Sequence, residues 1–150
     1  MLLMVAVLTL ELRGARSTHR LLASLWMLGA CLAMGHSFGA LFTFHHGSQA
    51  EALESTAQQT EKLLGFRFAA GLYINYIFVL VWMIDATLRL VVPKRYDLFP
   101  HAYRVAVLGF LVFIAINGAI VFKEGWMRTI GFACVLWLAF LFIRKRRDHV

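Results

Sequence analysis

The chain has 150 residues, of which 61% are hydrophobic and only 15% are charged. Soluble domains carry about a quarter charged residues, so this composition excludes an ordinary soluble fold and indicates an integral membrane protein. The net charge of +7 does not indicate nucleic-acid binding. Most Lys and Arg residues flank apolar segments instead of forming one basic face.

The first twelve residues are apolar but reach only about half way across a bilayer. They favour an interfacial helix or a partial span, and the remainder of a longer helix is a third interpretation. The basic segment Arg13–Arg20 follows. We expect it on the cytoplasmic side, because cytoplasmic loops are enriched in Lys and Arg.

Four later segments are apolar and long enough to cross the membrane. They cover residues 21–44, 68–92, 105–122 and 126–143. Basic residues follow the second span at Lys94 and Arg95 and follow the fourth at 144–147. The sequence therefore predicts an all-α, polytopic four-helix bundle in one domain, with a cytoplasmic C-terminus.

The connection between the first two spans, residues 45–67, is polar and carries no basic cluster, so we expect it outside the cell. Ser48 followed by Glu51 is typical of a helix N-terminus, and Gly65 is a natural stop. This pattern predicts a short amphipathic helix over the outer mouth of the bundle.

Small residues recur four apart along the first span, at Cys31, Gly35, Gly39 and Thr43. Small side chains on one face let membrane helices approach closely. The pattern therefore predicts a packed face, either within the chain or against a partner.

Polar side chains on three different spans fall at a similar depth, in the outer half of the predicted bundle. They are His36, Asn75 and Asn117, with Tyr76 nearby. Polar groups inside a membrane need partners. The convergence indicates a site for a cofactor, an ion or a lipid-like ligand, and the alternative is hydrogen bonding between helices.

A metal site at the outer surface is a related hypothesis. Its candidate ligands are His36, His45, His46 and Glu51. Imidazole suits copper and zinc, and a haem with His36 as its single histidine ligand is a further candidate. The alternative for the histidine pair is a polar helix end at the interface.

Asp85 and Arg89 lie four residues apart near the inner end of the second span. A carboxylate inside a membrane indicates an ion or proton path by default. The spacing also allows a fixed ion pair on one helix face. Both interpretations stay open at this point.

The runs ESTAQQTEKLLGF, AAGLYINYIFVLVWMID and INGAIVFKEGWMRTIG follow a histidine in the first span and an HH pair outside it. This combination resembles a group of small, uncharacterised bacterial four-helix integral membrane proteins. The resemblance implies a location in the bacterial inner membrane and no particular activity.

Signatures of phosphate-binding loops, serine hydrolases and zinc proteases are absent from the sequence. The leading hypothesis is a non-catalytic membrane protein that binds a ligand at the outer cluster or serves as a subunit of a redox or transport complex. The alternatives are a small ion or proton transporter using Asp85 and a membrane enzyme for a lipid or quinone. Expected partners are membrane lipids, and further copies or other subunits.

Overall fold

The structure is a computed structural model and describes residues 2–12, 19–121 and 125–147. The described chain is helical and contains no strand. In order, the elements are α1 (Leu2–Leu12), α2 (His19–His45), α3 (Gln49–Leu64), α4 (Gly71–Val91), α5 (Pro93–Tyr96), α6 (His101–Ile116), a π-helical turn η2 (Asn117–Val121) and α7 (Trp126–Arg147). The predicted all-α fold is confirmed.

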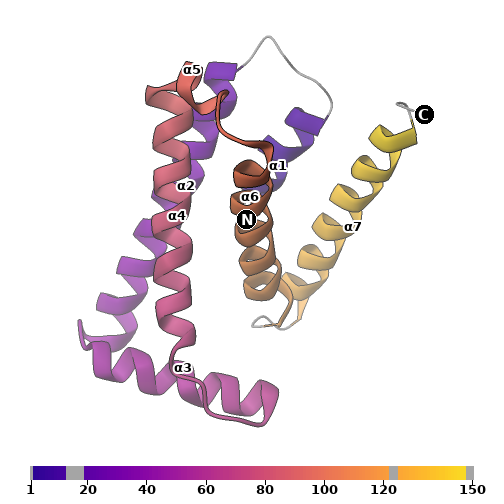
Figure 1. The fold of residues 1–150 in the computed structure, drawn as a ribbon. Coiled ribbons are helices and arrows are strands. Elements are labelled where there is room, and N and C mark those ends of the chain that lie inside the picture. The colour runs from indigo at the N-terminus through magenta and orange to yellow at the C-terminus, as the bar shows by residue number, and fades with distance from the viewer. Residues whose placement is uncertain (1, 13–18, 122–124, 148–150) are drawn as a thin grey trace.

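Four of the described helices are long and apolar enough to cross a membrane. They are α2, α4, α6 with its continuation into η2, and α7. Most of the predicted basic segment Arg13–Arg20 lies outside the described residues, as do most of the residues between the third and fourth predicted spans. Figure 1 shows α3 across one end of the spans and α5 at the other. We call these the α3 end and the α5 end.

The core lies between α2 and α4, which pack against each other along the bundle. The indole rings of Trp26 and Trp82 lie 5.3 Å apart, and Phe78 stacks edge-on at 5.5 Å from Trp82. Gly29 faces this cluster, and a Cβ there would lie 2.8 Å from Cζ2 of Trp82. A glycine is therefore required where the large ring meets the helix backbone.

The predicted small-residue face of α2 lies away from this contact. A Cβ added at Gly35 or Gly39 would meet no atom within 4 Å, and Cys31 is exposed. The close approach of α2 to α4 occurs at Gly29 instead, so this face of α2 is open toward the surroundings of the protein.

The first helix packs beside the spans instead of lying across their ends. Val7 on α1 is fully buried, and α1 contacts α2 and α7. Thr9 accepts a hydrogen bond from the indole of Trp137 at 3.2 Å. Its position corresponds to the partial span among the interpretations of this segment.

The last two spans are packed less tightly than the first two. Figure 1 shows α6 and α7 meeting near the α3 end and diverging toward the α5 end, where α1 contacts both α2 and α7. Gly131 makes the close contact where they meet, since a Cβ there would lie 3.0 Å from the carbonyl oxygen of Ala119. In their most apolar stretches, α6 and α7 bury 6% and 11% of residues, against 28% in α2 and α4.

The amphipathic helix predicted in the polar connection is α3, and its ends match the prediction. Ser48 accepts a hydrogen bond from the backbone N–H of Glu51 at 3.2 Å. Gly65 ends the helix with φ of 79°, a left-handed conformation that favours glycine.

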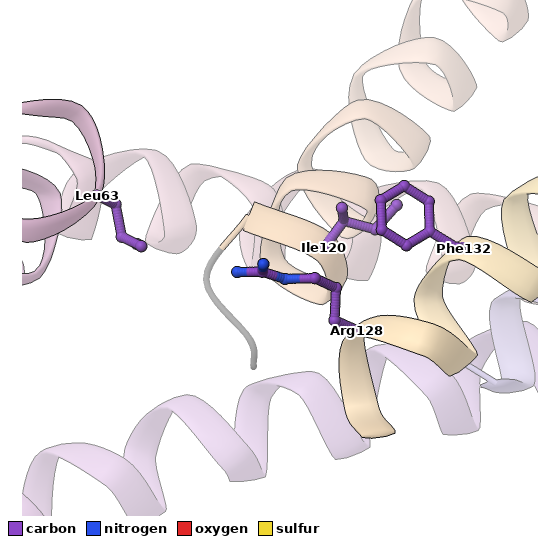
Figure 2. A pocket seen from close by; sticks show the side chains of 4 residues that line it. All are labelled: Leu63, Ile120, Arg128 and Phe132. Atoms are coloured by element: carbon purple, nitrogen blue, oxygen red, sulfur yellow. The ribbon is translucent and has the colours of Figure 1, made fainter. Parts of the chain in front are cut away.

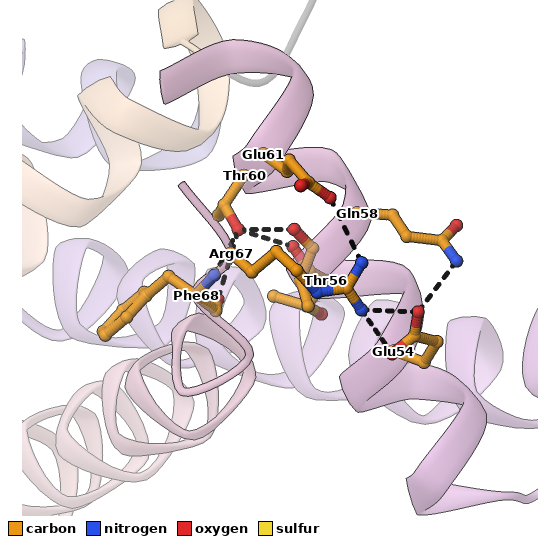
Figure 3. Close-up of polar contacts among 8 residues, drawn as sticks. Glu54, Thr56, Gln58, Thr60, Glu61, Arg67 and Phe68 are labelled. Carbon is orange, nitrogen blue, oxygen red and sulfur yellow. Dashed lines mark hydrogen bonds and ion pairs between the residues drawn. The ribbon is translucent and has the colours of Figure 1, made fainter. Parts of the chain in front are cut away.

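The chain beyond Gly65 is fastened back onto α3 by two side chains (Figure 3). Arg67 bridges Glu54 and Glu61, at 2.6 and 3.1 Å. The hydrogen bonds from Arg67 and Gln58 lower the pKa of Glu54. The buried hydroxyl of Thr60 accepts from the N–H of Phe68 at 2.9 Å, which positions the start of α4.

Candidate functional site

A buried carboxylate near the α5 end is held from two sides. Asp85, on α4, is only 1% exposed. The indole N–H of Trp26 donates to its Oδ2 at 2.8 Å, and the hydroxyl of Tyr96 donates to its Oδ1 at 2.8 Å. Both carboxylate oxygens therefore have partners, one from α2 and one from α5.

Arg89 lies one turn further along α4 and completes this cluster. Its Nε lies 2.8 Å from Oδ2 of Asp85 and donates to the hydroxyl oxygen of Tyr96 at 3.1 Å. Its Nη1 pairs with Oε1 of Glu11 on α1 at 2.8 Å. The guanidinium carbon lies 4.8 Å from the ring centre of Trp26 and 5.2 Å from that of Tyr96, within cation–π range. We call these five residues the Asp85 network.

The Asp85 network contains the ion pair expected from the four-residue spacing and adds three residues that sequence reasoning missed. Glu11 is the acidic residue of an otherwise apolar segment, and this isolated charge indicates that it needs a cationic partner. Trp26 looks like any apolar core residue, and Tyr96 lies in a short connection where nothing in the sequence points to Asp85. A carboxylate surrounded by two neutral hydrogen-bond donors and one cation is suited to joining helices.

Tyr96 belongs to α5, outside the candidate spans. Burial raises the pKa of Tyr96 to about 12. The hydrogen bond to Asp85 acts in the same direction, whereas the charge of Arg89 lowers the pKa. The hydroxyl is therefore a proton donor throughout the physiological range.

The polar residues expected to converge near the α3 end each have a separate environment. Asn75 is half-buried and donates to the hydroxyl of Ser37 at 3.3 Å. Asn117 donates to the carbonyl of Phe113 at 2.8 Å, within its own helix. His36 is exposed and has no hydrogen bond within the described part of the chain. As a ligand site, this group stays a prediction.

Tyr76, the fourth candidate, reaches the surface at the α3 end. Its hydroxyl donates to Oε1 of Gln49 at 3.1 Å, which ties α4 to the start of α3. The bond joins the polar connection to the second span.

Three of the four candidate metal ligands lie at the junction of α2 and α3, whereas His36 lies nine residues before the end of α2. His45 is the last residue of α2 and is half-buried, while His46 is exposed in a left-handed conformation with φ of 50°. Glu51 is exposed on the first turn of α3. Among the described residues, no three His, Cys, Asp or Glu side chains gather as they would around a metal ion.

A shallow hollow of about 340 Å³ opens near the α3 end (Figure 2). Its lining comes from three elements: Leu63 of α3, Ile120 of η2, and Arg128 and Phe132 of α7. The hollow is wide open to the surroundings, so its shape is not that of a pocket that encloses a small molecule.

No protein-family model matches the sequence, and no curated protein or solved structure matches it significantly. The class of protein is therefore set by the fold alone. The four apolar helices define a multi-pass α-helical membrane protein.

Proposed function

We propose that this chain is a non-catalytic subunit of a larger membrane complex in the bacterial inner membrane. The observation that supports docking is the position of His36. This side chain is exposed within a candidate span, nine residues from the end of α2, which is about 14 Å at 1.5 Å per residue. A polar group facing lipid at that depth is costly, whereas a hydrogen bond to a neighbouring helix satisfies it.

The surroundings of His36 suit a helix of a second protein. Gly39 and Thr43 follow at spacings of three and four on the same face of α2, and both are exposed. Gly39 has open space where a side chain would stand. Apolar exposure alone favours neither lipid nor protein, because lipid covers apolar faces equally well. The imidazole beside open glycines supports a protein partner.

The test is the mass of the particle extracted from its native membrane in a lipid-preserving polymer. We expect a particle heavier than one 17.0 kDa chain with its lipid. Gly39→Leu should reduce it to a single chain by blocking the approach of a partner helix. Gly109→Leu is the matched control, because Gly109 on α6 is equally open. A single chain for the unmodified protein, or equal masses for all three, would contradict the proposal.

The same preparation tests the cofactor hypothesis through its visible absorption and metal content. A Soret band, or copper, zinc or iron in stoichiometric amount that His36→Leu removes, would replace docking by cofactor binding. The ion or proton path at Asp85 and the enzyme acting on a lipid or quinone stay predictions.

We further propose that the α5 end faces the cytoplasm, so that the C-terminus is cytoplasmic. The support is the concentration of Lys and Arg at this end, at Lys94, Arg95 and the last turn of α7. A reporter that is active only in the cytoplasm should be active when it is fused after Val150. Activity of a reporter that works only outside the cytoplasm would show the reverse orientation.

A further inference from the structure

The connection from α4 to α6 is held against the ends of the spans by its aromatic side chains. Tyr96 is buried and bonded to Asp85 and Arg89. Its ring lies 5.8 Å from that of Phe99, which lies 5.0 Å from that of Tyr103. The connection is therefore anchored and presents its other side chains in a fixed arrangement.

Those other side chains have the composition of a surface that contacts lipid headgroups. Lys94 and Arg95 are exposed on α5, and Leu98 is 83% exposed in the turn that follows. Because α4 ends at Val91 and α6 begins at His101, this segment lies where the spans leave the membrane. An exposed leucine between cations suits the boundary between acyl chains and phosphates.

The cations of this connection lack anionic partners. Within the described residues, Lys94, Arg95 and Arg104 form no ion pair with a carboxylate, although Asp97 lies between them in the sequence. The Nε of Arg104 is buried and has no hydrogen-bond acceptor in the described part of the protein. The side chain as a whole is only half-buried, and phosphate oxygens match the geometry of the N–H groups at the end of the guanidinium.

We propose that the connection Pro93–Arg104 binds the headgroup of an anionic phospholipid in the leaflet at the α5 end. Arg104 binds a phosphate oxygen through the N–H groups at the end of its guanidinium, and Lys94 and Arg95 supply the remaining positive charge. Tyr96 is a positioning residue, since it holds α5 on the Asp85 network. The bilayer supplies this lipid laterally, and Leu98 contacts its acyl region.

The test is native mass spectrometry of the full chain in detergent, titrated with phosphatidylglycerol or with phosphatidylcholine. We expect preferential retention of phosphatidylglycerol. Arg104→Gln should weaken it about five-fold or more, since each cation near a membrane surface contributes about that factor. Lys62→Gln, which removes an exposed cation from α3, is the control and should leave the affinity unchanged.

Two further variants separate lost charge from lost arrangement. Tyr96→Phe keeps every cation and should still weaken phosphatidylglycerol binding, whereas Arg104→Lys should restore part of the affinity lost in Arg104→Gln. Equal retention of the two lipids, equal effects of Arg104→Gln and Lys62→Gln, or full displacement of the lipid by millimolar inorganic phosphate would each overturn the proposal.

Discussion

At the scale of single residues, Trp26 and Trp82 differ in one respect that a pair of variants can measure. Both indoles are buried, but the N–H of Trp26 donates to Asp85, whereas that of Trp82 has no partner in the described chain. Hydrogen bonds to charged groups contribute about 1.5–3 kcal/mol. Trp26→Phe should lower the free energy of unfolding in mixed micelles by about that much more than Trp82→Phe. Equal losses would show that the indole N–H does not hold Asp85.

The raised pKa of Tyr96 gives the protein a pH dependence with a definite sign. The folded protein keeps the phenol protonated up to about 12, against an ordinary pKa of 10.0, so the folded state binds the proton more tightly than the unfolded state. The stabilisation is fully present below pH 10 and is lost as the pH rises through about 12. In an absorbance titration of tyrosinate, Tyr96→Phe should match the unmodified protein near pH 10 and fall below it only near 12. A difference already complete near pH 10 would contradict the buried hydroxyl.

At the scale of elements, the contact between α2 and α4 depends on Gly29. A Cβ at this position would lie 2.8 Å from the ring of Trp82, which is itself buried and has little room to move. Overpacking of this kind costs about 1–3 kcal/mol. Gly29→Ala should therefore lower the free energy of unfolding. Gly35→Ala, with open space around it, should be neutral or slightly stabilising, because alanine favours helix. The same effect for both variants would rule out the close approach at Gly29.

The junction between α3 and α4 depends on the hydroxyl of Thr60. It accepts from the N–H of Phe68, whereas the hydroxyl of Thr56 bonds only the carbonyl of Ala52 in its own helix. Thr60→Val leaves a backbone donor without its acceptor, a cost of about 1–3 kcal/mol. The amide hydrogen of Phe68 should exchange about ten-fold faster or more in this variant. Thr56→Val is the control. Equal exchange rates of the Phe68 amide in the two variants would contradict the role of the Thr60 hydroxyl at this junction.

The sequence predicted the elements well, because their signals are local. Span lengths follow from apolar runs, and the ends of α3 follow from Ser48 and Gly65. The face of α2 that packs could not be predicted in the same way. Gly35 and Gly39 form the recognisable motif, but the close contact falls at Gly29, since it depends on where α4 places the ring of Trp82.

The polar sites show the same difference between local signals, which the sequence contains, and contacts between distant segments, which it does not. The four-residue spacing predicted the pair of Asp85 and Arg89, whereas Glu11 and Trp26 come from distant helices.

At the scale of the whole molecule, the Asp85 network joins four elements at the α5 end, namely α1, α2, α4 and α5. The helices α6 and α7 bury far fewer of their residues. The protein thus combines a tightly joined part with two lightly packed spans. This division agrees with a subunit whose own fold is fixed around α4 while other faces stay available to the membrane and to partners.

The continuity of the Asp85 network is tested most directly by a double-mutant cycle between Glu11→Gln and Tyr96→Phe, measured as free energy of unfolding in mixed micelles. Glu11 and Tyr96 lie on different helices and share Arg89 as a partner. Residues in one hydrogen-bond and ion-pair network couple by about 0.5–3 kcal/mol, whereas independent sites add within about 0.3–0.5 kcal/mol. We predict a coupling of about 1 kcal/mol. Additivity within about 0.3 kcal/mol would show that α1 and α5 are held separately and that no single network joins them.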